Sequence, residues 1–181
     1  LEEYDPAQVK AALSARELRM AHNFDEHLAE WPADEKLILL GHALHLSQDS
    51  TNVHDDNFGA MWESVGTYLA RRLPGQVYGI WAVHRRGEHG VPRAQPPIQP
   101  LMAPRGAVEH LLASVGSRYL LPLGSGDPRE AWLDQERTFT FHGVAGRAVL
   151  PDQADCLFFL EVATPPGARP RPGQAGGEAP R

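Results

Sequence analysis

Short apolar runs alternate with stretches of helical periodicity along most of this sequence. Four runs have the length and composition of buried strands, at residues 36–41, 76–83, 118–123 and 156–162. Apolar residues recur every three or four positions, as in amphipathic helices, at residues 5–31, 58–73 and 106–116. Strands that alternate with helices predict an α/β fold with a mixed, partly parallel sheet flanked by helices.

The segments between these elements are polar or rich in Pro and Gly. Loops are expected at 50–57 and 85–104, a short helix at 127–134 and a further strand at 147–150. The chain has 181 residues and is 42% hydrophobic, which suits one domain, here expected over residues 1–164. Residues 165–181 contain Pro, Gly, Ala and Arg without apolar anchors, so a disordered tail is expected there.

Charge and cysteine content exclude several classes of protein. The net charge is -6, and the tail carries three Arg and one Glu, so residues 1–164 carry -8 and are poorly suited to nucleic acid. No apolar run approaches the roughly 20 residues of a membrane helix, and no cofactor is expected. Cys156 is the only cysteine, which leaves no internal disulfide and favours a cytoplasmic setting. The sequence starts with an acidic stretch and no Met, so a processed or excised piece is expected.

Two histidines follow the first apolar run. His42 and His45 come directly after "LILLG", where the strand is expected to end. Ligands of open α/β sheets bind beyond the carboxyl ends of the strands. A turn or helix start would aim both imidazoles at one pocket, and the alternative is an ordinary loop that happens to contain two histidines.

A metal site is a further alternative for these histidines. Together with the run "HDD" at 54–56 they could supply zinc-type ligands. A His-x-x-His pair is a weak signal, however, and the "HDD" run stands among Ser, Thr and Asn. We therefore predict that no metal is required.

Several segments together resemble the erythromycin esterase family, which also includes proteins described as succinoglycan biosynthesis proteins. The segments are "RELRMAHN" at 16–23, "GHALH" at 41–45, "SVGTYLARRL" at 64–73, "PRGAVE" at 104–109 and "DCLFFLEVATP" at 155–165. The chain departs from the family pattern at His22, at Ala43 and Leu44, and at Ala107. The family domain is about twice as long, and its N-terminal half carries a Gly-Glu-x-x-His-Gly motif with an essential His and Glu. The resemblance thus implies that this chain is the C-terminal half.

The resemblance implies a hydrolase in which histidine assists the attack of water on an ester or lactone carbonyl. It makes His42 the best-supported site residue, with His45 beside it. Arg16 is a candidate to hold the oxyanion, because it lies between Leu13 and Met20 on the apolar side of its helix. The alternative for Arg16 is an apolar stem with its charged end in water.

Three further residues are candidates with weaker support. Glu109 is a catalytic candidate at the start of a helix, where a carboxylate is also stabilised by the helix dipole alone. Arg19 and Asn23 share one face of a helix with Arg16 and are candidates for substrate binding.

A second function stays open beside the hydrolase. The chain would then be a non-catalytic remnant or a ligand-binding module with the same fold. The expected partners are a small-molecule ester or lactone and either the N-terminal half or a second copy, with macrolide resistance as one possible role.

Overall fold

The computed structural model describes residues 5–32, 34–56, 58–90, 98–141 and 144–164. Its α-helices are α1 (Pro6–Glu30), α2 (Val65–Arg72) and α3 (Val108–Leu112). Its 3-10 turns are η1 (Ala43–Leu46), η2 (Ser50–Asn52), η3 (Pro128–Glu130) and η4 (Leu150–Asp152). Its strands are β1 (His54–Asp55), β2 (Gly59–Ala60), β3 (Ile80–Gly90), β4 (Ile98–Met102), β5 (Arg118–Pro122), β6 (Arg137–Phe141), β7 (Val144–Ala148) and β8 (Cys156–Ala163).

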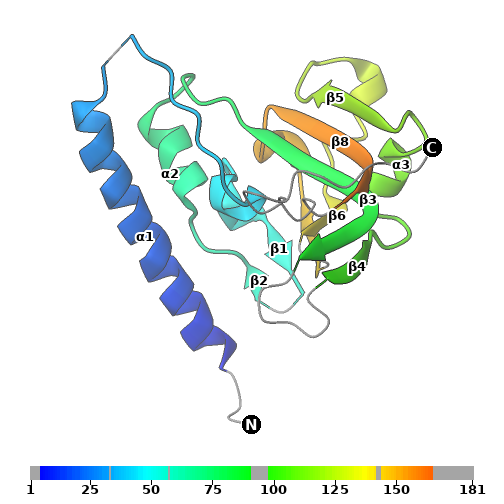
Figure 1. Ribbon diagram of the computed structural model, residues 1–181, viewed down its shortest axis with the longest axis horizontal. Helices are drawn as coiled ribbons and strands as arrows, with labels where there is room; N and C mark the ends of the chain where they lie inside the picture. The colour runs from blue at the N-terminus through cyan, green and yellow to red at the C-terminus, as the bar shows by residue number, and fades with distance from the viewer. Residues whose placement is uncertain (1–4, 33, 57, 91–97, 142–143, 165–181) are drawn as a thin grey trace, which may run out of the picture.

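The strands form two four-stranded sheets, with the orders β2-β1-β7-β6 and β4-β3-β8-β5. Strands β3 and β8 run parallel, and the other paired strands run antiparallel. Helices α1 and α2 lie on one side of the molecule and the sheet of β3, β8 and β5 on the other, with η1 between them (Figure 1). The predicted α/β class with a mixed, partly parallel sheet is confirmed.

The core lies where the two sheets and α3 meet. Trp81 of β3 and Phe139 of β6 are fully buried, and their ring centroids are 5.5 Å apart. Leu157 and Phe159 of β8 lie opposite Trp81 and Val83 in the parallel register, and all four are buried. Because successive side chains of a strand point to opposite faces, these alternate residues present one apolar face to the core.

Helix α1 confirms the predicted helix at 5–31. The Asp5 side chain accepts a hydrogen bond from the Ala7 N–H at 2.9 Å, and Pro6 occupies the first turn. The helix ends at Glu30, before Trp31 and Pro32. Most of α1 is half-buried or exposed, and its buried residues are Glu17 and Ala21.

Helix α2 packs closely against the backbone of η1. A Cβ atom added at Gly66 would lie 2.3 Å from the carbonyl carbon of Leu46, so only glycine permits this approach. Ser64 caps the helix, because its side chain accepts from the Thr67 N–H at 3.2 Å.

The predicted strand at 36–41 is wrong for this structure. Residues 36–41 have no regular secondary structure, and Ile38 and Leu40 are exposed. A strand exists only when another strand accepts its backbone hydrogen bonds. In the described part of the chain no strand pairs with this segment.

Other boundaries also differ from the prediction. The helix expected at 58–73 begins only at Val65, because residues 59–60 form β2 and Gly59 has a φ of 67°. The loop expected at 85–104 contains the end of β3 paired with β4, and residues 91–97 lie outside the described residues.

Three shorter predictions need correction as well. The polar loop expected at 50–57 contains η2 and β1, and the helix expected at 127–134 contains only the 3-10 turn η3. The strand expected at 147–150 is β7, which begins at Val144 and pairs with β6, a strand that the prediction missed.

The predicted disordered tail at 165–181 lies outside the described residues. Among the described residues, no helix combines the length and the hydropathy needed to cross a membrane.

The contact of Gly66 with η1 predicts a stability effect. The substitution Gly66→Ala should lower the free energy of unfolding by about 1 to 3 kcal/mol, because the added methyl group overpacks against Leu46. Helix propensity alone would favour Ala by about 1 kcal/mol, so the sign of the change is informative. Gly116→Ala is the matched control, since its Cβ would meet only Tyr119 at 3.6 Å. Urea unfolding measures both variants, and a stabilised Gly66→Ala variant would contradict the close packing.

Candidate functional site

The 3-10 turn η1 holds both histidines that follow the first apolar run. His42 caps the turn: its Nδ1 accepts a hydrogen bond from the Leu44 N–H at 3.3 Å. Its carbonyl oxygen accepts from the N–H groups of His45 and Leu46, at 3.0 and 3.2 Å. A 3-10 turn has three residues per turn, so residues 42 and 45 share one side. The two rings lie edge to face, with centroids 6.0 Å apart.

His45 forms an ion-pair contact with a buried carboxylate of α1. Its Nδ1 lies 2.6 Å from Oε1 of Glu17, and only 1% of the Glu17 side chain is exposed. The other oxygen, Oε2, accepts a hydrogen bond from the Val65 N–H at 3.1 Å. The His45 side chain is 26% exposed although its Nδ1 is buried, so solvent reaches the rest of the side chain. Glu17 therefore joins three elements, α1, η1 and α2.

The position of Glu17 explains why a carboxylate is tolerated in this interior. It lies at the N-terminus of α2, where unpaired N–H groups and the helix dipole stabilise negative charge. The 2.6 Å contact with Glu17 uses Nδ1 of His45, so Nε2 is the ring nitrogen that lies outside this contact. For His42 the arrangement is the opposite: Nδ1 accepts from Leu44, so the neutral ring carries its proton on Nε2.

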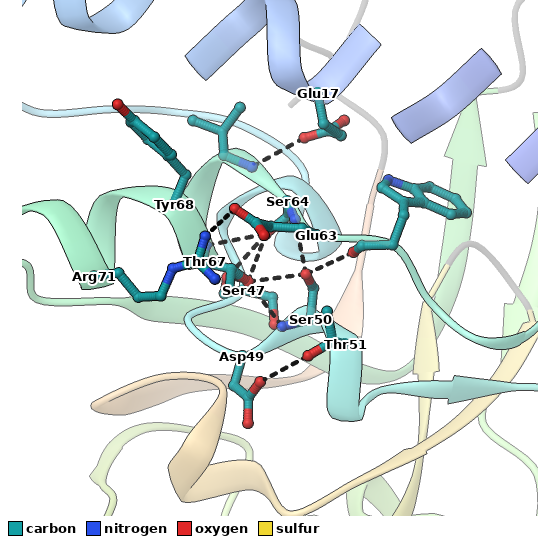
Figure 2. Close-up of polar contacts among 12 residues, drawn as sticks. Glu17, Ser47, Asp49, Ser50, Thr51, Glu63, Ser64, Thr67, Tyr68 and Arg71 are labelled. Atoms are coloured by element: carbon teal, nitrogen blue, oxygen red, sulfur yellow. Dashed lines mark hydrogen bonds and ion pairs between the residues drawn. The ribbon is translucent and has the colours of Figure 1, made fainter. Parts of the chain in front are cut away.

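A buried cluster of hydroxyl groups fixes η1 and η2 to the start of α2 (Figure 2). Thr67 Oγ1 accepts from the Ser50 N–H at 2.9 Å and donates to the Ser47 carbonyl at 3.0 Å. Ser64 Oγ donates to the same carbonyl at 2.9 Å, and Ser50 Oγ donates to the Trp62 carbonyl at 2.7 Å. The three hydroxyl groups and the Ser47 carbonyl all belong to buried residues. The backbone that follows His45 is thus held by several hydrogen bonds rather than by apolar packing alone.

A second set of hydrogen bonds links this region to the parallel strands. Ser47 Oγ donates to the side chain of the fully buried Gln153. Gln48 Nε2 and the Gly79 N–H both donate to Asp155 Oδ2 at 2.6 Å. Gly79 and Asp155 directly precede β3 and β8. The histidine turn is therefore positioned against both the helices and the central strands.

The predicted residues of α1 lie on a different side of the helix from Glu17. Arg16, Arg19 and Asn23 are exposed, so the guanidinium of Arg16 is not desolvated as its place between Leu13 and Met20 suggested. Consecutive helical residues are about 100° apart, and here Glu17, not Arg16, points at the histidine turn. A role of these three residues in oxyanion or substrate binding stays a prediction.

Glu109 has hydrogen-bond partners of its own. It lies in the short helix α3, is fully buried, and its Oε1 accepts from the N–H and the hydroxyl of Thr140, both at 2.7 Å. Its Oε2 is buried and has no hydrogen-bond partner among the described residues. Burial raises the pKa of the Glu109 carboxyl, and the hydrogen bonds from Thr140 offset only part of that rise. These contacts tie α3 to β6, and a catalytic role of Glu109 also stays a prediction.

The residues considered for a metal site are spread over different elements. His54 and Asp55 form β1, and Asp55 Oδ1 accepts from the Phe58 N–H at 3.0 Å in the turn to β2. Within the residues that the structure describes, no group of three or more His, Cys, Asp or Glu side chains is placed to hold a metal ion.

The sequence did not identify Glu17 as a candidate site residue. Its position was informative, because Leu13, Glu17, Met20, Phe24 and Leu28 follow the helical spacing of one face. A carboxylate inside an apolar stripe requires a partner in the fold. That partner is His45, which is close in space but 28 positions away in the sequence.

Three comparisons with known proteins bear on this arrangement. The family model described as Erythromycin esterase matches residues 1–163. No curated protein matches the sequence. Among solved structures, a succinoglycan biosynthesis protein matches with a TM-score of 0.54 and 18% identity, over 68% of this chain and 32% of that one. A protein from Bacillus cereus matches with a TM-score of 0.55 and 14% identity, over 68% of this chain and 33% of that one. The chain therefore spans about a third of the length of the structures it resembles.

The first prediction from the site concerns Glu17 and stability. Glu17→Ala should lower the free energy of unfolding by about 2 to 4 kcal/mol, because buried polar groups of His45 and Val65 lose their partner. Glu26→Ala, an exposed carboxylate on the same helix, is the control and should change it by less than about 0.5 kcal/mol. Urea unfolding at neutral pH measures both. Equal effects of the two substitutions would show that the contact of Glu17 does not hold η1 and α2 on α1.

The second prediction concerns the pH dependence that Glu109 causes. Because the folded state raises the pKa of Glu109 above the ordinary value of 4.5, the folded chain holds this proton more tightly than the unfolded chain. The contribution of Glu109 to stability is therefore full below that ordinary value and is lost as the pH rises through the raised one. Glu109→Gln keeps a carbonyl oxygen for Thr140 and cannot ionise. Its stability relative to the wild type should increase between pH 4 and pH 8, as measured by urea unfolding. A constant difference between the two proteins over this range would contradict a raised pKa.

Proposed function

Because the chain belongs to the erythromycin esterase family, we propose that it takes part in the hydrolysis of an ester or lactone, with His45 as the base that activates water. The observation that carries this proposal is the contact of His45 Nδ1 with the buried carboxylate of Glu17 at 2.6 Å. A carboxylate that orients a histidine through one ring nitrogen leaves the other nitrogen to accept a proton.

The proposed reaction follows from this arrangement. Water gives a proton to Nε2 of His45 while its oxygen attacks the carbonyl carbon, and a tetrahedral intermediate forms with negative charge on the carbonyl oxygen. Glu17 stabilises the imidazolium that results. The proton then passes to the leaving oxygen as the carbon–oxygen bond breaks, which yields an acid and an alcohol, or one hydroxy acid from a lactone.

His42 and Arg16 are proposed for the opposite task, the stabilisation of the oxyanion. The neutral His42 ring carries its proton on Nε2, since its Nδ1 accepts from Leu44, and an N–H group can donate to a carbonyl oxygen. Arg16 is proposed on the family resemblance, since its exposed side chain lies on a different side of α1 from Glu17. Arg19 and Asn23 are proposed to contact more distant parts of a substrate, and Glu109 to support the site from α3.

The family comparison also limits what this chain does alone. It spans about a third of the solved structures that it resembles, so two thirds of such a fold lies in other residues. The family resemblance places an essential His and Glu in an N-terminal half. We therefore propose a shared site, in which this chain supplies the His45 and Glu17 pair and a macrolide lactone requires the other half as well. A non-catalytic ligand-binding module is the competing function.

The proposal is tested with an activated ester and a macrolide lactone. The full chain should hydrolyse p-nitrophenyl acetate slowly, and His45→Gln should lower kcat/KM by about 10²-fold or more, because the general base is lost. Glu17→Gln should lower kcat by about 10- to 100-fold and alter its pH profile with little change in KM, since it acts through His45. Mass spectrometry should show no opening of the macrolide ring by the chain alone.

His27→Gln is the matched control, because His27 is an exposed histidine of α1 outside the pair. Its kcat/KM should equal that of the wild type. Ester hydrolysis that does not depend on His45 would favour the non-catalytic alternative. Ring opening by the chain alone, abolished by His42→Ala, would show that the site is complete without a second half.

A further inference from the structure

The segment Lys36–Gly41 has the sequence of a β-strand, but it pairs with no strand among the described residues. Ile38 and Leu40 are 83% and 91% exposed, whereas Leu37 and Leu39 are 44% and 38% exposed. This alternation with a period of two is that of an extended chain with one face turned toward the protein. Four consecutive large apolar residues in this position are an unusual surface for a folded protein.

One face of the segment rests on the end of α1. Leu37 and Leu39 line an apolar groove together with Phe24, Leu28 and Trp31 of that helix and its cap. The segment thus leaves α1, turns back along its last turns, and leads into η1 (Figure 1). The opposite face, which carries Ile38 and Leu40, is turned to solvent.

The backbone of the segment is also unpaired. Among the described residues, no backbone hydrogen bond involves an N–H or carbonyl group between Lys36 and Gly41. Natural edge strands usually carry charges, prolines or bulges that prevent pairing with other chains. Within Lys36–Gly41, Lys36 is the only charged residue, and the segment contains no proline. The segment therefore presents apolar side chains and backbone groups that pair with no other described residue.

We propose that Lys36–Gly41 is a docking strand that pairs with a β-strand from the remaining part of an esterase-type domain. The two similar solved structures are each about three times as long as the part this chain matches, so a domain of that length has further residues from which such a strand would come. A second copy of this chain is the less favourable occupant, because each copy carries a net charge of -6 and the copies repel.

This pairing has a direct consequence for the histidine turn. Gly41 is followed at once by His42 and η1, so a strand added beside 36–41 ends within a few residues of the two imidazoles. The partner would bring its own side chains to the same edge. The docking depends only on the segment Lys36–Gly41. It can therefore be tested separately from the chemistry proposed for His45.

The test uses the full chain and overlapping ten-residue synthetic peptides that span the unmatched part of the similar succinoglycan biosynthesis protein. Main-chain hydrogen bonds dominate strand addition, so the low identity of 18% does not prevent pairing. A small set of overlapping peptides should slow amide hydrogen exchange of residues 37–40 by about tenfold or more, because pairing protects those N–H groups. The remaining peptides should have no effect.

Two variants make the result specific. Ile38→Pro together with Leu39→Pro removes one N–H from each edge of the strand and should abolish the protection. These residues belong to no helix or strand, so the variant should keep its fold, which circular dichroism checks. Leu18→Lys, which removes an exposed leucine of α1, should leave peptide binding unchanged.

Each of three outcomes would overturn the proposal. One is that no peptide protects residues 37–40 at millimolar concentration. Another is that peptides bind equally well to the proline variant. The third is a dimer, seen by light scattering, in which residues 37–40 are already protected without peptide, since this would assign the surface to a second copy. None of these measurements involves catalysis, so the result is independent of the hydrolysis assay.

Discussion

A single buried carboxylate, that of Glu17, joins α1 to η1 and to the start of α2. Glu17 extends from the middle of α1, accepts the Val65 N–H at the start of α2, and contacts His45 of η1. Burying a charge in a protein is costly unless it is paired and hydrogen-bonded. Both oxygens of Glu17 have such a contact, which makes the position of α1 depend on polar contacts as much as on its apolar stripe.

Other residues also fix η1 against the start of α2. Gly66 permits the backbone of η1 to approach α2. The hydroxyl groups of Ser50, Ser64 and Thr67 and the carbonyl group of Ser47 fix that approach by direct hydrogen bonds. A buried polar network of this kind specifies one arrangement, because each member would be unsatisfied in any other. These hydrogen bonds hold the histidine turn in one position, as the proposed role of His45 as a base toward water requires. Of the side chains proposed to meet a substrate, His42 and His45 are half-buried and Arg16 is exposed.

The elements that the sequence predicted well are those with strong local signals. Asp5 and Pro6 predicted the start of α1. The apolar run at 156–162 predicted β8, which lies between β3 and β5 in its sheet. The missed elements depend on distant partners: β6 is a short run, "RTFTF", whose role is clear only from its pairing with β7. Within the site, local spacing brought His42 and His45 onto one turn, as expected. The contact of Glu17 with His45 joins residues far apart in the sequence. Helical spacing places Glu17 on the apolar face of α1, but no local pattern identifies His45 as its partner.

The segment Leu37–Leu40 shows why a predicted strand can be absent from the structure. Its composition and alternation are those of a strand, but a strand is defined by hydrogen bonds to a neighbour, and composition cannot supply that neighbour. The segment therefore has the sequence of a strand, but in the structure its Ile38 and Leu40 are exposed and it pairs with no described strand. A neighbour would bury Ile38 and Leu40 and satisfy the backbone at once, which makes pairing favourable on two independent grounds. Because this segment leads directly into the turn that holds His42 and His45, a strand docked beside it would lie next to that turn, whatever chemistry the two histidines perform.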